Sequence, residues 1–322
     1  MVIATIVAFF VIVLGAYVRL SHAGLGCPDW PGCYGKLTWP VAETEIVLAN
    51  EAYPERPVET GKAWREMVHR YLAGALVVLV LMINYQAWKH RLRRNNIQKI
   101  AMALLVLIFA QAALGMWTVT LKLLPVIVMA HLLGGLATFG MLIWLVMNSR
   151  GKQYTEPPDA YLPFRPLILA GLIVLVGQLA LGGWTSANYA ALACPDFPTC
   201  HGEIWPDTNF KEGFVLFREI GVDYEGGVLD QPSRTAIHLA HRFGAVVTFL
   251  VLGILALQLS LKSTSRSGGV LLAVVLCAQV LLGILNVVLY LPLPNAVAHN
   301  GTGALLLAVM IWLTHRSKLR FQ

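Results

Sequence analysis

The chain has 322 residues, of which 57% are hydrophobic and only 13% are charged, and its mean hydropathy is +0.66. Because a soluble domain carries about 25% charged residues, this composition excludes a disordered chain, a small secreted disulfide scaffold and an ordinary cytosolic enzyme. The formal net charge of +7 does not indicate a nucleic-acid partner, since the basic residues lie between apolar stretches and form no separate basic domain.

Eight apolar stretches are long enough to cross a bilayer, which takes about 20 helical residues each. In chain order, the predicted spans are residues 2–20, 66–87, 100–119, 126–147, 167–187, 235–260, 269–290 and 296–314. Each is predicted to be a helix, because a single segment in lipid must satisfy its own backbone hydrogen bonds. Runs such as residues 76–81 lack the alternation of a transmembrane barrel strand. The first stretch lacks the basic n-region of a cleaved signal peptide.

The loops between the spans alternate in charge. One set contains thirteen Lys or Arg against two acidic residues and comprises residues 88–99, 149–166, 261–268 and 315–322. The two long loops, 21–65 and 188–234, contain fourteen Asp or Glu against seven Lys or Arg. The positive-inside rule therefore predicts a multi-pass protein of the cell membrane, with both termini in the cytoplasm and the long loops on the outer face.

Four of the five cysteines lie in these long loops, as Cys27 and Cys33 and as Cys194 and Cys200. Both pairs have Cys-x5-Cys spacing and lie on the side predicted to be oxidising, which favours two disulfides, Cys27–Cys33 and Cys194–Cys200. Two zinc half-sites are the alternative. Cys277 lies within a predicted span and is expected to be a small buried apolar residue.

The two halves of the chain repeat each other at an offset of 167 to 172 residues. Residues 27–35 match residues 194–202 at six of nine positions. Three further matches follow in the same order, namely His69-Arg70 with His241-Arg242, Gln111-x-x-x-Gly115 with Gln279-x-x-x-Gly283, and His131-x-x-x-Gly135 with His299-x-x-x-Gly303. Because each unit has an even number of spans, both units cross the membrane in the same direction.

The fold class predicted from this repeat is an all-α integral membrane protein of eight transmembrane helices, arranged as two pseudo-symmetric, parallel four-helix bundles. The expected divisions are an N-terminal half at residues 1–150, a cytoplasmic linker at 151–166 and a C-terminal half at 167–322.

Four histidines recur in the repeat, near the outer ends of the second and fourth spans of each half: His69, His131, His241 and His299. Each half can bring two imidazoles together from different helices, which is the arrangement that ligates the iron of a membrane b-type haem. We expect Gly74, Gly135, Gly244 and Gly303 to make room for the macrocycle. The alternative is that the histidines are structural, but a repeated set of polar residues in the membrane favours a function.

Three arginines also lie near the outer ends of spans: Arg19, Arg70 and Arg242. Pairing with haem propionates and snorkelling to the membrane interface are equal alternatives for them.

The halves differ at one position beside these histidines. The first contains Glu66-x-x-His69, whereas the second contains His238-x-x-His241. Residues three apart share a helix face, so Glu66 is expected to project beside His69 and to act as a base or to stabilise positive charge. The alternatives are a Glu at a helix N-terminus or an ion pair with Arg65 or Arg70. The half with the carboxylate is therefore favoured for chemistry, and the other half for an electron-transfer or structural cofactor.

The chain resembles the haem A synthase family in a combination of four features. These are the run at residues 24–33, the Glu66-x-x-His69-Arg70 motif, the paired His131 and His299, and the duplicated four-span unit. The resemblance covers nearly the whole chain. It implies an oxidoreductase that converts haem O to haem A for terminal oxidases by oxidising the C8 methyl group of the macrocycle to a formyl group. Two successive hydroxylations would give a geminal diol, which loses water.

The resemblance also implies a role for each site residue. Substrate haem maps to His69 and His131, a resident haem b cofactor maps to His241 and His299, and the family's essential glutamate maps to Glu66. The expected partners are haem O, membrane lipid, haem O synthase, assembly factors of the terminal oxidase and a second copy of the chain.

The residues themselves leave two alternatives, a di-haem b-type electron-transfer protein and a haem transporter or chaperone. The electron-transfer alternative gives no reason for Glu66 in one half only. The sequence leaves open the electron acceptor, the oxygen source, the oligomeric state, any redox role of the cysteines and the roles of residues 41–63 and 207–232.

Overall fold

The computed structural model describes residues 1–90, 97–149 and 160–318. Within these ranges, eight helices are long and apolar enough to cross a membrane, and the secondary structure contains no strand beyond two isolated bridges. The eight are α1 (Val2–Leu20), α3 (Thr60–Lys89), α4 (Ile97–Thr120), α5 (Pro125–Ser149), α6 (Arg165–Ala187), α8 (Gln231–Leu261), α9 (Arg266–Val288) and α10 (Leu293–Arg316). The prediction of an all-α membrane protein with eight spans is confirmed.

Two helices begin well before the spans that hydropathy predicts. Helix α3 begins at Thr60 rather than at residue 66, and α8 begins at Gln231 rather than at residue 235. At α8 the Asp230 side chain caps the helix by accepting a hydrogen bond from the Ser233 N–H (3.0 Å). Hydropathy detects only the apolar part of a helix, so the polar first turns outside the membrane were missed.

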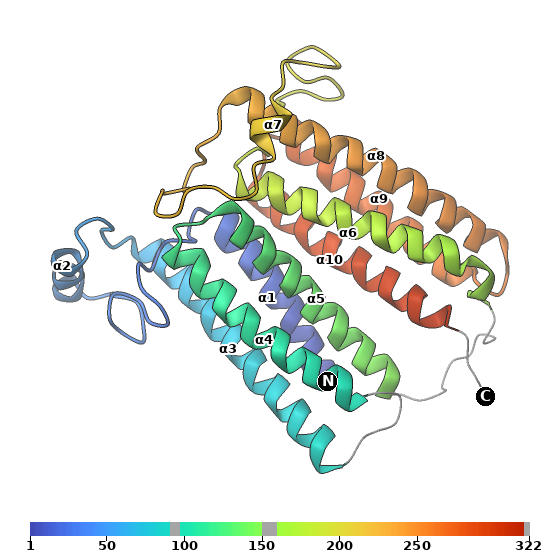
Figure 1. Ribbon diagram of the computed structural model, residues 1–322, viewed down its shortest axis with the longest axis horizontal. Helices are drawn as coiled ribbons and strands as arrows, with labels where there is room; N and C mark the ends of the chain where they lie inside the picture. Colours follow the sequence, from blue (N-terminus) through green and yellow to red (C-terminus); the bar gives the residue numbers. More distant parts are fainter. Residues whose placement is uncertain (91–96, 150–159, 319–322) are drawn as a thin grey trace.

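The long helices lie side by side, with the two long loops gathered at one end (Figure 1). These loops carry the short helices α2 (Glu43–Ala52) and α7 (Phe210–Gly213). The start of α1 and the end of α10 lie at the opposite end (Figure 1). The side of the membrane on which each end lies stays a prediction.

Within each half, the helices pack in a closed cycle. Helix α1 packs on α3, α3 on α4, α4 on α5 and α5 on α1, and the second half repeats this order with α6, α8, α9 and α10. The histidine-bearing helices α3 and α5 therefore lie diagonally across the first cycle, as α8 and α10 do across the second. The halves also pack on each other through α1 with α10 and α5 with α6 and α10.

Because the helices form one continuous assembly, the division into two bundles stays a prediction. Of the predicted linker, residues 151–159 lie outside the described residues, and Leu162–Phe164 form a 3-10 turn that leads into α6. The basic residues 91–94 and the end of the chain from 319 also lie outside them.

The prediction that Cys277 is buried is wrong. Its side chain is exposed on the surface of α9, the least buried of the eight spans. A span that faces lipid does not need to bury its apolar residues against protein, because the hydrocarbon itself is an apolar environment.

Candidate functional site

Each of the four repeated imidazoles lies against a glycine of a neighbouring helix. A Cβ atom on that glycine would lie only 3.0 to 3.3 Å from Cε1 of the ring. The pairs are Gly15 with His69, Gly115 with His131, Gly182 with His241 and Gly283 with His299. Only a residue without a side chain leaves this space for the ring. Gly74, predicted to make room for the macrocycle, has no neighbouring group within 4 Å of such a Cβ.

Within each half, the two imidazoles lie close enough to interact electrostatically, His69 with His131 and His241 with His299. Nδ1 of His69, of His131 and of His299 is buried and has no hydrogen-bond partner among the described residues. These residues also include no group of three or more His, Cys, Asp or Glu that could hold a bare metal ion. Two imidazoles on helices that lie diagonally across a four-helix cycle instead fit a haem, whose macrocycle supplies the other four ligands of its iron.

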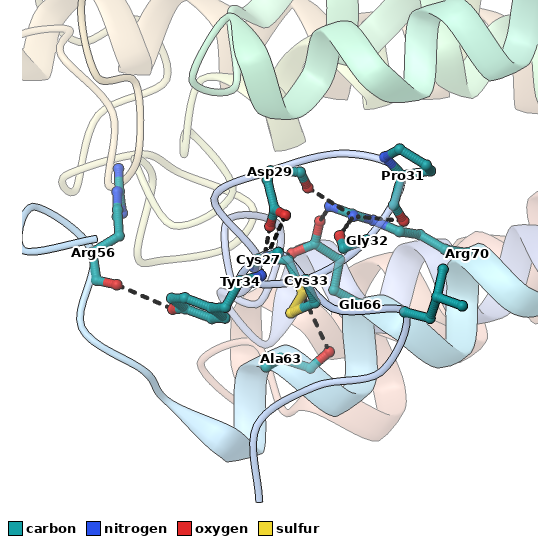
Figure 2. The surroundings of a disulfide bond; sticks show 12 residues. Cys27, Asp29, Pro31, Gly32, Cys33, Tyr34, Arg56, Ala63, Glu66 and Arg70 are labelled. Carbon is teal, nitrogen blue, oxygen red and sulfur yellow. Dashed lines mark hydrogen bonds and ion pairs between the residues drawn. A yellow bond between two sulfur atoms is a disulfide. The ribbon is translucent and has the colours of Figure 1, made fainter. Parts of the chain in front are cut away.

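Glu66 is buried in the second turn of α3, and both of its oxygens are engaged. Oε2 accepts a hydrogen bond from the main-chain N–H of Cys27 (2.9 Å), and Oε1 pairs with the Arg70 guanidinium. Figure 2 shows these groups around the Cys27–Cys33 disulfide. Of the alternatives for Glu66, the helix N-terminus is therefore wrong, and the ion pair is with Arg70 rather than Arg65.

The two outer disulfide loops have the same construction. The cysteines pair as predicted, Cys27 with Cys33 and Cys194 with Cys200. In the first loop, the Asp29 carboxylate accepts hydrogen bonds from the N–H groups of Tyr34 (2.6 Å) and Gly35 (2.8 Å). This carboxylate closes the loop into a tight turn.

The Asp196 carboxylate closes the second loop in the same way. It accepts from the N–H groups of His201 (2.6 Å) and Gly202 (3.0 Å). Hydrogen bonds from the Thr199 hydroxyl and from these main-chain groups lower the pKa of Asp196 to about 2. The carboxylate is therefore ionised at any physiological pH, and the loop keeps this turn.

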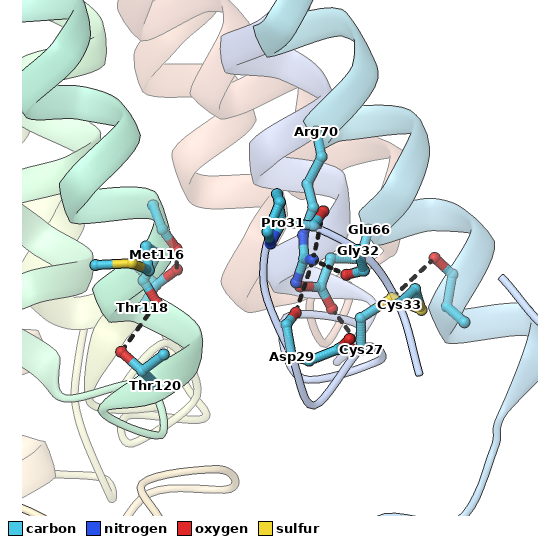
Figure 3. Close-up of polar contacts among 12 residues, drawn as sticks. Cys27, Asp29, Pro31, Gly32, Cys33, Glu66, Arg70, Met116, Thr118 and Thr120 are labelled. Carbon is cyan, nitrogen blue, oxygen red and sulfur yellow. Dashed lines mark hydrogen bonds and ion pairs between the residues drawn. A yellow bond between two sulfur atoms is a disulfide. The ribbon is translucent and has the colours of Figure 1, made fainter. Parts of the chain in front are cut away.

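Arg70 and Arg242 fasten these loops to the helices. The Arg70 guanidinium donates to the carbonyl oxygens of Asp29 (2.8 Å) and Gly32, and Arg242 donates to those of Thr199 and Asp196 (2.8 Å each). Figure 3 shows Arg70 and Glu66 directed together at the first loop. The guanidinium groups thus bind protein carbonyls, and propionate pairing and snorkelling stay predictions.

Arg19 contacts the second half of the chain. Its Nη2 donates to the Ser186 carbonyl (2.5 Å), and its guanidinium lies 3.9 Å from the centroid of the Tyr189 ring. Because Arg19 ends α1 and these partners lie at the end of α6, this contact joins the two halves.

The whole chain also resembles known proteins. The family model for COX15-CtaA, described as cytochrome oxidase assembly protein, matches residues 1–311. The chain belongs to this family. A relative from Shewanella oneidensis named heme A synthase is 43% identical over 313 residues, which cover 97% of this chain and 94% of the relative. Relatives of the same name from Novosphingobium aromaticivorans and Rhizorhabdus wittichii are 28% and 24% identical, over 96% and 98% of this chain and 92% of each relative.

In this COX15-CtaA family member, the second outer loop reaches over the first half of the chain. Tyr224 is buried among Leu25, Leu123 and Leu124, and its N–H donates to the Lys122 carbonyl (3.0 Å). This contact lies in the stretch 207–232, for which the sequence predicted no structure.

An ion-pair cluster joins the two outer loops beside this contact. Arg56 of the first loop pairs with Asp223 and with Glu225 (2.6 Å) of the second. The other unassigned stretch, 41–63, contains α2, which projects away from the long helices (Figure 1). Lys36 and the N–H groups of Val41 and Ala42 lower the pKa of Glu45 in α2 to about 2.

Sequence reasoning missed Gln178, which contacts the His241 ring. A signal was available, because Gln178-x-x-x-Gly182 repeats the pattern found at Gln111 and Gln279. It singled out His238 but missed its contact, since Nδ1 of His238 accepts from the Cys194 N–H (3.2 Å) at the position that Glu66 occupies in the first half.

Proposed function

We propose that the protein is a haem A synthase, an oxidoreductase that converts the C8 methyl group of haem O to the formyl group of haem A. The names of its relatives support this proposal, and so does the duplicated pair of imidazoles. The observation that carries the proposal is the inequality of the halves, Glu66 in one and His238 in the other.

Glu66 and His238 both accept a hydrogen bond from the N–H of the first cysteine in a disulfide loop. Because an imidazole is sufficient for that contact in the second half, fastening the loop does not require a carboxylate. The negative charge of Glu66 therefore serves a further purpose in the first half. A carboxylate one turn from His69 is suited to take a proton from the methyl group at C8 or to stabilise positive charge that develops on its carbon.

The proposed substrate site lies between His69 and His131, and haem O enters it from the bilayer with its farnesyl tail in lipid. His241 and His299 would hold the resident haem b, which supplies one-electron transfer when bound. The substrate methyl is hydroxylated twice, and the resulting geminal diol loses water to give the aldehyde. Each hydroxylation withdraws an electron pair from the substrate and requires an external electron acceptor and an oxygen source.

The proposed setting is the cell membrane, with both termini in the cytoplasm and the disulfide loops on the outer face. The basic loops predict this orientation. Proposed partners are haem O synthase, which would supply the substrate, the assembly factors of the terminal oxidase, which would take the product, and a second copy of this chain.

The test is the haem content and product of the full-length protein purified from cells that make haem O. Haem is extracted from the wild type and from Glu66→Gln and is separated by chromatography. Glutamine keeps the size of the side chain and its acceptor for the Cys27 N–H but removes the charge. We expect haem A formation to fall at least about 100-fold, with the absorbance of the His241–His299 haem unchanged.

The matched control is His238→Gln, which keeps an acceptor for the Cys194 N–H and should retain haem A formation. Haem A made by Glu66→Gln at the wild-type rate would refute the role of Glu66. Two haem B per chain without any farnesylated haem would instead support a di-haem electron-transfer protein.

A further inference from the structure

The four imidazoles do not receive the same support. In the second half, Nε2 of Gln178 lies 3.0 Å from Nδ1 of His241 and also donates to the His241 carbonyl (3.0 Å). Nε2 of Gln279 lies 3.3 Å from Nε2 of His299. Nδ1 of His69, of His131 and of His299 has no hydrogen-bond partner in the described part of the chain, so of the four rings only His241 is contacted at this nitrogen.

The position of Gln178 depends on Gly244. A Cβ atom at Gly244 would lie 2.1 Å from Oε1 of Gln178, so only glycine leaves space for the carboxamide to lie along α8 beside His241. Gly244 follows His241 by three residues, and Gln178 precedes Gly182, the glycine against this ring, by four.

Both members of this arrangement differ in the first half. Val11 precedes Gly15 by four residues where Gln178 precedes Gly182, and Leu72 follows His69 by three where Gly244 follows His241. At His69, the first half thus lacks both the carboxamide and the space that it requires, whereas beside His131 the carboxamide of Gln111 lies against Gly134, three residues after that histidine. His69 packs against its glycine as His241 does, but no polar side chain holds its ring.

This difference matters for a metal ligand. An imidazole that ligates iron through Nε2 carries its proton on Nδ1, and a hydrogen-bond acceptor there fixes the tautomer and the ring orientation. The Gln178 carboxamide presents this acceptor after half a turn about its last bond, which exchanges its oxygen and nitrogen and gives up the hydrogen bond to the His241 carbonyl. Loss of such a partner typically lowers metal affinity 10- to 100-fold.

We propose that Gln178, packed against Gly244, is a positioning residue that holds His241 and so retains haem in the second half. In the first half, Val11 and Leu72 occupy the matching positions and leave His69 as an exchangeable ligand. The inference rests on the proposed function, because it accounts for one permanent and one exchanging haem in a duplicated scaffold. It assigns the difference to two positions rather than to the ligands themselves, which are identical in the two halves.

The test is the rate at which haem leaves the full-length protein for excess apomyoglobin. Cells that make only haem B supply the protein, and His69→Ala with His131→Ala restricts haem to the second half. In this background we expect Gln178→Leu to release haem about 10 to 100 times faster. Gln258→Leu, the same change at an exposed position of α8, should not alter the rate.

Gln178→Glu keeps an acceptor for Nδ1–H and tests the hydrogen bond separately from packing. We expect slow release to be retained and the midpoint potential of the haem to fall below that of the wild type, because a carboxylate increases the electron donation of the imidazole. Release as fast as in Gln178→Leu, with no change in potential, would show that the hydrogen bond is not the cause.

The reciprocal change is Val11→Gln with Leu72→Gly in the otherwise wild-type chain, and it should slow the release of the more rapidly lost haem. If Gln178→Leu releases haem at the wild-type rate and its haem has the wild-type midpoint potential, the inference is overturned, whether or not the protein forms haem A. The two proposals can also fail separately. If Gln178→Leu releases haem faster while Glu66→Gln forms haem A normally, the inference about Gln178 is supported and the proposed role of Glu66 is wrong.

Discussion

The two halves of the chain fasten their disulfide loops with different buried groups. In the first half, the Glu66 carboxylate accepts from the Cys27 N–H and pairs with Arg70. In the second, the neutral acceptor is Nδ1 of His238, and the described hydrogen bonds of Arg242 go to carbonyl oxygens. The arginine and one acceptor are therefore what the loop requires, and a negative charge is not.

A duplicated scaffold thus separates structural requirements from chemical ones. Contacts present in both halves, such as the glycine behind each imidazole, serve the common architecture. Contacts that differ between matching histidines, such as the Glu66–Arg70 pair beside His69 and the Gln178 carboxamide beside His241, are where the functions of the halves differ.

The largest effect is expected from removing one pair of imidazoles. His241→Ala with His299→Ala should abolish haem that survives purification, because iron then loses both axial ligands in the half that retains haem. His69→Ala with His131→Ala should leave that haem in place and abolish haem A formation. The measurement is haem per chain together with the low-spin absorbance bands. Equal loss of haem in the two variants would contradict the assignment of the halves.

The next largest effect is expected from exchanging the two groups that accept from the cysteine N–H, Glu66 and His238. In Glu66→His, the loop keeps an acceptor, so we expect a change in unfolding free energy within about 1 kcal/mol and a fall in haem A formation of at least about 100-fold. His238→Glu makes the opposite change and should retain haem A formation. Thermal unfolding and haem extraction measure the two effects. A Glu66→His protein that makes haem A normally would show that any acceptor suffices.

The disulfides should contribute similarly to stability in the two halves. Each closes a loop between cysteines six residues apart, so replacing either pair by serine should cost about 2 kcal/mol. Only the pair at Cys27 also supports Glu66, so its loss should reduce haem A formation more than the loss of the pair at Cys194. Cys277→Ser, at an exposed thiol without a disulfide, is the control. A larger loss of haem A formation on replacement of the Cys194–Cys200 pair than of the Cys27–Cys33 pair would contradict this prediction.

The smallest effect is expected at the contact between the outer loops. Arg56→Ala removes pairs with Asp223 and Glu225, whose side chains are 46% and 24% exposed. Solvent screens such pairs, so we expect a loss of about 0.5 to 1 kcal/mol that shrinks in high salt. Lys36→Ala, which removes an exposed pair with Glu45 within one loop, should have less effect. The midpoint of thermal unfolding at low and high salt distinguishes the two variants.

The features that the sequence predicted correctly are those with a local or repeated signal. The eight spans follow from hydropathy, and the Cys27–Cys33 and Cys194–Cys200 pairs follow from spacing and the side of the membrane. The position of Cys277 was wrong because hydropathy does not distinguish a lipid-facing side chain from a buried one. The starts of α3 and α8 were wrong because their first turns are polar.

The sequence alone therefore determined the membrane helices, the internal repeat, the four repeated histidines and the carboxylate three residues before His69, since each can be recognised from neighbouring residues or from a constant offset. Only the tertiary structure decided which groups meet: Glu66 with Cys27, Arg56 with Glu225, and Gln178 with both Gly244 and His241. Most of these partners are separated by tens of residues or more in the chain. Their contact depends on how the helices and outer loops pack, and that packing is encoded by the whole set of helix surfaces rather than by any one segment.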